Sequence, residues 1–225
     1  SRSDVPAKEH KAPRRKPVIF PDLEQAEPKT EKPRMNVSSQ SDVVIFDLET
    51  QKLAEDVGGW RNVRKMGLSI AVVHTEQNGF LTFTEANVAD LIAVLKGAGL
   101  VVGFNHIRFD YEVLKAYTSE DLRMLPNLDI LVDVEAGLGH RLSLDHLATF
   151  TLGEQKSGKG TDAAKWFREG RMDLLEKYCR DDVRITRDLY RFGLDNGFLR
   201  YQMKNGQIAS LQVSWRSGNV AQSLV

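Results

Sequence analysis

The sequence predicts an α/β domain preceded by a tail and followed by a β-hairpin. Three observations indicate this arrangement. From residue 41 onward, short apolar runs alternate with stretches of helical periodicity. Six of the seven prolines lie in the first 33 residues, and an Asn-Gly pair separates two alternating segments near the C-terminus. We therefore expect a Pro-rich tail over residues 1–35, a folded domain over 41–195 and a hairpin over 198–215.

The apolar runs predict a five-stranded sheet flanked by helices. The predicted strands are residues 43–48, 68–74, 80–83, 100–104 and 128–132. The turn Glu76-Gln77-Asn78-Gly79 joins the second strand to the third. Helical periodicity covers residues 88–95, 108–117 and most of 142–193, where residues 153–160 read as a loop.

The terminal hairpin allows a prediction of register. A two-residue Asn-Gly turn would place the apolar residues of its two strands on opposite faces. A three-residue loop, Lys204 to Gly206 with Gly206 left-handed, pairs Leu199 with Leu211 and Tyr201 with Ala209. We predict the second form, because it gathers the apolar side chains on one face.

The composition sets limits on the function. The 225 residues have 41% hydrophobic content, 28% charged content and a formal net charge of zero, which is typical of one globular domain. No apolar run approaches the roughly 18 residues of a membrane span, so we expect a soluble, cytoplasmic protein without a membrane partner. The single cysteine, Cys179, excludes an internal disulfide and a thiolate zinc site.

The zero net charge of the protein is the sum of a positive N-terminal tail and a negative remainder. Residues 1–35 hold nine basic and six acidic residues, a net charge of +3, so the remainder carries −3. The tail lacks the apolar periodicity of a core, which predicts a disordered linker or, alternatively, a weak arm for nucleic acid or a protein partner. Position 1 is not Met, which leaves open that the chain is a piece of a longer protein.

Carboxylates lie in three segments where a negative charge is energetically unfavourable if it has no compensating partner. Asp47 and Glu49 end the first predicted strand on one face, although a strand end that leads into a solvated loop is the commoner origin of such a pair. The segment from Asn105 to Asp110 follows a strand and opens a helix, where a simple capping role is the alternative. Asp182 falls on the apolar stripe of the last long helix, and a buried acid needs a partner such as a metal ion.

Together these segments resemble a known enzyme family. The ordered set is Asp-x-Glu at 47–49, Asn-x-x-x-Phe-Asp at 105–110 and Tyr-x-x-x-Asp at 178–182. It resembles the DEDD superfamily of 3′–5′ exonucleases, whose fold is ribonuclease H-like with a central mixed sheet. The spelling is similar to family B polymerase exonucleases and to bacterial exonuclease modules found with helicases. The histidine branch carries His where this chain has Lys177, so the resemblance implies the tyrosine branch.

The resemblance implies a chemistry and a set of site residues. Asp47, Glu49, Asp110 and Asp182 would hold two divalent cations, Mg²⁺ or Mn²⁺, and Tyr178 would orient the attacking water. The substrate would be the 3′ end of single-stranded DNA or RNA, and a helicase or another domain of a longer parent protein would be a partner. Two alternatives stay open: a nucleic-acid-binding or regulatory module that does not cut, and an endonuclease.

Substrate contacts are predicted at several further residues. Asn105 and Phe109 belong to the middle motif. Arg61 and Arg64 follow Trp60 after the first motif and are expected to bind a single strand. The alternative is surface charge beside a core tryptophan. Lys156 and Lys159 in the predicted loop are expected to touch a phosphate backbone, with a solvated loop as the alternative.

Overall fold

The computed structural model describes residues 43–154 and 160–215. The predicted tail and the loop residues Lys156 and Lys159 lie outside these ranges. The strands are β1 (Val43–Thr50), β2 (Leu68–Thr75), β3 (Gly79–Thr84), β4 (Leu100–Gly103), β5 (Asn127–Asp129), β6 (Phe198–Gln202) and β7 (Ile208–Gln212). The α-helices are α1 (Val88–Gly97), α2 (Asp110–Leu114), α3 (Ile130–Leu138), α4 (Leu144–Leu147), α5 (Gly160–Arg168) and α6 (Met172–Asn196).

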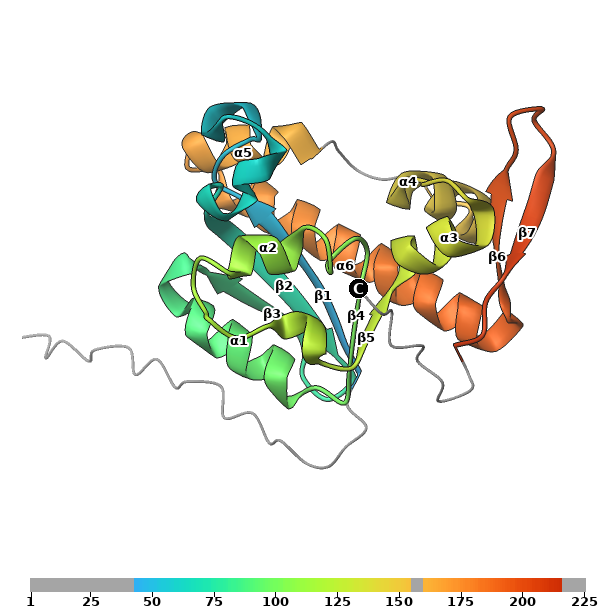
Figure 1. The fold of residues 1–225 in the computed structure, drawn as a ribbon, viewed down its shortest axis with the longest axis horizontal. Coiled ribbons are helices and arrows are strands. Elements are labelled where there is room, and N and C mark those ends of the chain that lie inside the picture. The colour runs from blue at the N-terminus through green and yellow to red at the C-terminus, as the bar shows by residue number, and fades with distance from the viewer. Residues whose placement is uncertain (1–42, 155–159, 216–225) are drawn as a thin grey trace, which may run out of the picture. The chain divides into compact units, whose positions relative to one another are not determined.

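A mixed sheet of five strands forms the centre of the domain, as the sequence predicts. Its order is β3-β2-β1-β4-β5, with β3, β2 and β1 antiparallel and β1, β4 and β5 parallel (Figure 1). The β2–β3 hairpin forms at the predicted turn, where Thr75 pairs with Gly79. The site described below lies beside the C-terminal half of β1 and beyond the carboxyl end of β4, and the carboxyl ends of parallel strands commonly carry binding sites.

Helices cover both faces of this sheet. Adjacent residues of a strand point to opposite faces, and β1 shows which helix covers which face. Ile45 packs in a core cluster with α6 residues that include Val183 and Ile185. Phe46 stacks on Tyr111 of α2, with ring centroids 6.3 Å apart. The sheet is therefore the middle layer of an α/β/α sandwich, with α6 on one side and α2 on the other.

The long helix α6 follows the apolar stripe that the sequence predicts. Leu175, Tyr178, Asp182 and Leu189 are all buried. The helix ends at Gly197, whose φ of 76° allows the left-handed cap and whose N–H binds the carbonyl of Gly193. Because the buried stripe faces the sheet, it carries the polar groups of Tyr178 and Asp182 to the end of β1.

The predicted fifth strand is partly wrong. Residues 128–132 are not one strand, because β5 ends at Asp129 and α3 begins at Ile130. The carboxylate of Asp129 accepts a hydrogen bond from the N–H of Leu131 and so caps the helix. The apolar run served both a strand and a helix, which hydrophobicity alone does not distinguish.

The C-terminal hairpin has the predicted register. Leu199 pairs with Leu211 and Tyr201 with Ala209. Gly206 has a φ of 85°, and its N–H binds the carbonyl of Met203, which closes the three-residue loop. Leu199 and Leu211 are both buried against the core cluster, so one face of the hairpin packs onto the domain.

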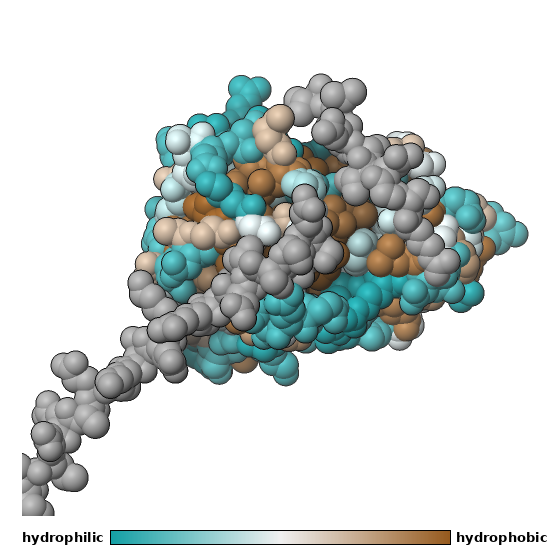
Figure 2. All heavy atoms as spheres, turned by 90° about the horizontal axis from the view of Figure 1, so that it is seen from below, coloured by the Kyte–Doolittle hydropathy of each residue, from teal (hydrophilic) through white to brown (hydrophobic). Residues whose placement is uncertain are grey.

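Much of the surface is polar. On the face shown in Figure 2, hydrophilic residues form a broad band, and hydrophobic residues gather beside it. The large apolar side chains exposed in the described ranges are Trp60 (71%), Met124 (82%) and Ile208 (53%). No helix within those ranges combines the length and the apolar content that a membrane crossing requires.

Candidate active site

The end of β1 supplies the first two carboxylates of the site. β1 pairs with β4 only as far as Ile45 and Val102, so the rest of β1 has no strand on that side. Asp47 and Glu49 follow Ile45 at alternating positions and therefore share its face, toward α6. Both side chains are half-buried. The alternation of the strand thus places two negatively charged side chains next to each other on the same face of the sheet.

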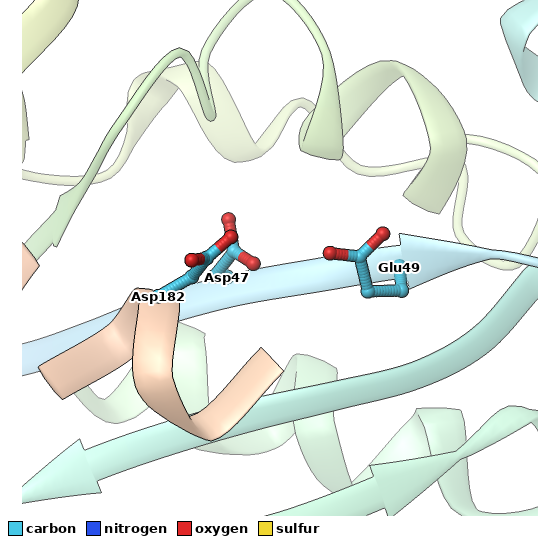
Figure 3. A group of neighbouring side chains, drawn as sticks. All are labelled: Asp47, Glu49 and Asp182. Atoms are coloured by element: carbon cyan, nitrogen blue, oxygen red, sulfur yellow. The ribbon is translucent and has the colours of Figure 1, made fainter. Parts of the chain in front are cut away.

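Asp182 of α6 joins these two acids. One carboxylate oxygen from each of Asp47, Glu49 and Asp182 lies within 4.8 Å of the others. Figure 3 shows the carboxyl groups of Asp47 and Asp182 near each other, with Glu49 further along β1. Asp182 is only 4% exposed. We call these three residues the acidic triad.

Asp110 lies in the same cavity but outside the acidic triad. It begins α2, is 2% exposed, and accepts a hydrogen bond of 3.0 Å from the N–H of Leu48. This N–H lies in the part of β1 that β4 does not pair, so the carboxylate occupies a free edge of the strand. Burial raises the pKa of Asp110 to about 8, while the hydrogen bond from Leu48 opposes the shift.

The raised pKa of Asp110 predicts a pH dependence of stability in chelator-treated protein. The pKa of Asp110 is about 8 in the folded protein and 3.8 for an ordinary aspartate, so its contribution to the stability of the fold is fully present below pH 3.8. This contribution is lost as the pH rises toward 8. Asp110→Asn should therefore gain stability relative to the unsubstituted protein, by up to about 1.4 kcal/mol per pH unit. Urea unfolding in EDTA between about pH 5 and pH 8 measures the difference.

A matched control is available at the exposed Asp121. Hydrogen bonds from Arg123 lower the pKa of this carboxyl to about 2. It is ionised in both folded and unfolded protein above about pH 5, so Asp121→Asn should leave the pH slope unchanged. Parallel stability curves for the Asp110→Asn variant and the unsubstituted protein would contradict the prediction.

A cavity of about 480 Å³ contains all four predicted carboxylates and the predicted tyrosine. Its walls come from the end of β1, the segment after β4, the loop before α4, and helices α2, α3, α4 and α6. The lining residues are Asp47, Leu48, Glu49, Phe104, Asn105, Phe109, Asp110, Leu131, Arg141, Leu142, Ser143, Leu144, Tyr178 and Asp182. The tertiary fold thus brings into one space residues that are 135 positions apart in the sequence.

Tyr178 lies one helical turn before Asp182 and is 2% exposed. Trp166 of α5 packs edge-on against its ring, with centroids 5.7 Å apart. Cys179, the next residue, is fully buried with its thiol 3.5 Å from the carbonyl oxygen of Asp47. Burial and the nearby carboxylates raise the pKa of this thiol well above its usual value, so it stays neutral. The ring of Tyr178 is thus fixed by packing at the cavity wall.

Asn105 is held in an unusual backbone conformation at the mouth of the cavity. Its φ is 67°, a left-handed value that no other non-glycine residue of the described ranges adopts. The buried carboxylate of Asp129 fixes the segment by accepting hydrogen bonds from the N–H groups of Asn105 (2.7 Å) and Ile107 (3.1 Å). Sequence reasoning did not identify this role of Asp129, because the two hydrogen bonds that fix the segment come from residues more than 20 positions away in the chain.

Two of the predicted substrate residues do not reach the cavity. Arg61 is exposed, and Arg64 pairs with Glu112 of α2 at 3.9 Å. Trp60 is exposed, so only the core-tryptophan part of that alternative is wrong. Its ring packs edge-on against Phe109, with centroids 6.1 Å apart. Phe109 lines the cavity, as Asn105 does.

The sequence prediction missed Arg141 as a site residue. It lies in the loop before α4 and lines the cavity, and its guanidinium donates a hydrogen bond of 2.8 Å to the side-chain oxygen of Asn105. A lone arginine in a loop carries no signal in the sequence. Only the contact with Asn105 identifies it.

The donor set of the cavity suits a hard divalent cation. The acidic triad offers only carboxylate oxygens, which are the ligands that Mg²⁺ and Mn²⁺ prefer. Three converging carboxylates repel one another unless a cation or protons compensate them. The residues present therefore fit a divalent metal ion.

Comparison with known proteins supports the architecture. The sequence matches no protein-family model and no curated protein. Among solved structures, a family B DNA polymerase from the hyperthermophilic archaeon Pyrobaculum calidifontis is similar over 69% of this chain, with a TM-score of 0.53 and 20% identity. The zinc-bound complex of E. coli exonuclease I with single-stranded DNA is similar over 70% of the chain, with a TM-score of 0.44 and 12% identity.

These likenesses concern the fold. The chain spans 25% of the polymerase chain and 41% of the exonuclease I chain. The ribonuclease H-like architecture expected from the three motifs is confirmed, including the mixed five-stranded sheet with its flanking helices and the additional hairpin.

Proposed function

We propose that this domain is a metal-dependent 3′–5′ exonuclease that hydrolyses phosphodiester bonds of single-stranded DNA or RNA. The observation that carries the proposal is the convergence of the acidic triad, Asp110 and Tyr178 on one cavity of a ribonuclease H-like fold. The motif order resembles the tyrosine branch of the DEDD exonucleases, and the similarity to a family B polymerase supports the same fold.

The electrostatics of the cavity favour a catalytic role over a purely structural one. A fold gains nothing from directing Asp47, Glu49 and the buried Asp182 at one another, because the repulsion lowers stability. Energetically unfavourable groups that persist are typical of functional sites. This argument weighs against a module that binds nucleic acid without cutting it.

The residues of the site have separable tasks. Asp47, Glu49 and Asp182 would hold divalent cations, with Asp110 contributing from the edge of β1. When bound, two such cations activate water and stabilise the leaving 3′ oxygen in phosphodiester hydrolysis. Tyr178, with its ring fixed by Trp166, would orient the attacking water through its hydroxyl. The product would be a nucleoside monophosphate.

Labelled single strands test the proposal. DNA and RNA oligonucleotides with a label at the 3′ end or the 5′ end are incubated with the protein and Mn²⁺ or Mg²⁺. We expect release of labelled mononucleotide from the 3′ label. EDTA should abolish the release, because it removes the cations that the acidic triad would hold.

The test also needs a control variant, Asp47→Ala, and a statement of which results would indicate another function. Asp47→Ala should be inactive under the same conditions. Fragments longer than a mononucleotide that keep the 3′ label would indicate an endonuclease. Binding of the oligonucleotide without any cleavage, in either metal, would indicate the non-cleaving module and contradict the proposal.

A further inference from the structure

A positively charged side chain lies in the wall of the cavity that holds the acidic residues. Among the lining residues that the structure describes, Arg141 alone carries a positive charge, whereas four carry carboxyl groups. Arg141 is exposed, while Asp110 and Asp182 are buried. The cation therefore lies at the mouth of the cavity and the acids lie deeper.

The guanidinium of Arg141 is oriented by an uncharged partner. Its Nη2 donates a hydrogen bond of 2.8 Å to Oδ1 of Asn105. Within the described ranges no carboxylate lies within 4.0 Å of this guanidinium to form an ion pair, although many arginines of the domain have such a partner. Among the described residues Arg141 thus has no ion-pair partner, and the one hydrogen bond to Asn105 uses one of its five donors.

The partner of Arg141 is itself rigidly placed. Asp129, which is 3% exposed, binds the N–H groups of Asn105 and Ile107 and thereby fixes the left-handed backbone of Asn105. A strained conformation held by a buried carboxylate is typical of a position where side-chain direction matters. The hydrogen bonds from Asn105 to Asp129 and from Arg141 to Asn105 therefore orient the guanidinium of Arg141 at the mouth of the cavity.

We propose that Arg141 is an anchor for a phosphate of the bound strand, and that this phosphate is the one on the 5′ side of the scissile phosphodiester. The inference rests on the proposed function. A guanidinium binds a phosphate through two parallel hydrogen bonds, which fixes the strand more precisely than a point charge does. The scissile phosphate itself belongs deeper in the cavity, beside the acidic triad. Arg141 therefore holds the neighbouring phosphate and sets the position of the strand.

Two substrates distinguish the neighbouring phosphate from the scissile one. An oligothymidylate contains both phosphates, whereas the p-nitrophenyl ester of thymidine 5′-monophosphate contains only the scissile one. Arg141→Gln should raise KM for the oligothymidylate about tenfold and leave kcat unchanged, because one charge-assisted bidentate contact is lost. KM and kcat for the ester should not change. Arg141→Lys should recover part of the affinity, since a lysine restores the charge but not the paired hydrogen bonds.

Direct binding provides a readout that does not depend on cleavage. The probe is a 5′-fluorescein-labelled oligothymidylate, and the protein carries Asp182→Asn so that the strand stays intact. Adding Arg141→Gln should weaken binding and reduce the slope of log Kd against log salt by about 0.7, the value for one phosphate contact on a single strand. Arg123→Gln is the matched control, because this half-buried arginine pairs with Asp121 and does not line the cavity.

The outcomes separate this proposal from the proposed function. If the unsubstituted protein cuts neither substrate, the proposed function fails, and reduced binding by the Arg141→Gln variant still supports the phosphate anchor. Equal binding and equal KM values in the Arg141→Gln variant and its parent overturn the anchor. An equal rise of KM for the ester also overturns it, because Arg141 would then act on the terminal nucleotide.

Discussion

Asp182→Asn should lower the rate of phosphodiester hydrolysis by about three orders of magnitude while leaving the fold intact. The substitution keeps the shape of the side chain but removes one charge from the acidic triad, whose oxygens lie within 4.8 Å of one another. A bound cation contributes several kcal/mol of transition-state stabilisation, and each 1.36 kcal/mol corresponds to a factor of ten in rate. The rate is measured on a 3′-labelled strand at saturating metal.

The same variant should be at least as stable as the unsubstituted protein in EDTA. Without metal, the three carboxylates repel one another, and removal of one charge relieves that repulsion. Added Mn²⁺ should raise the Tm of the unsubstituted protein by binding to the folded state, and should raise that of the variant less. Opposite changes in activity and stability are the signature of a residue kept for function.

The adjacent residue offers a matched control. Asp181 also lies on α6, but it is off the buried stripe, and its carboxylate lies 3.9 Å from the guanidinium of Arg184. Asp181→Asn should leave both the hydrolysis rate and the response of the Tm to Mn²⁺ unchanged. A Mn²⁺ response of the Asp182→Asn variant equal to that of the unsubstituted protein would show that Asp182 is not a metal ligand.

Tyr178→Phe should reduce kcat by about 10- to 100-fold and leave KM nearly unchanged. The hydroxyl lies at the cavity wall one turn from Asp182, where it can position a water molecule but makes no covalent bond to the substrate. Orientation of a reacting group by one hydrogen bond contributes less than a metal ligand does, which sets the smaller expected effect. Single-turnover and steady-state rates on the labelled strand separate kcat from KM.

Tyr190 provides the comparison for this substitution. It lies on the same helix, is 8% exposed, and stacks on Trp215 with centroids 5.8 Å apart, away from the lining of the cavity. Tyr190→Phe should retain the full rate. Since the ring of Tyr178 and its contact with Trp166 survive in the Tyr178→Phe variant, a full rate in that variant would reduce Tyr178 to a packing role.

The periodic segments could be predicted from the sequence because their pattern has a direct physical cause. In α6, the apolar stripe at 3.6-residue spacing must be buried, and this placed Tyr178 and Asp182 on the inner face while Asp181 stayed off it. In the hairpin, only the three-residue loop brings Leu199 and Leu211 to one face, and that register is the one observed. Both predictions needed only local geometry and the burial of apolar side chains.

The local pattern was insufficient to predict the secondary structure where one apolar run contributes to both a strand and a helix. Residues 128–132 have the hydrophobicity of a strand, yet Asp129 caps a helix that starts at Ile130. The same carboxylate also holds Asn105 and Ile107, which are more than 20 residues away in the sequence. A side chain that accepts hydrogen bonds from distant backbone N–H groups produces no periodic pattern in the sequence.

Local patterns were sufficient to predict the α/β fold, the order of the three motifs and the burial of Asp182, because periodicity and the cost of burying charge act locally. These patterns do not show that Asp47, Glu49 and Asp182 converge, that Asp110 lies at the unpaired edge of β1 outside the acidic triad, or that Arg141 lines the same cavity. These side chains come together because β1, α2, α6 and the loop before α4 meet only when the sheet forms. Distances between their side chains depend on strand pairing and helix packing, which no single segment encodes.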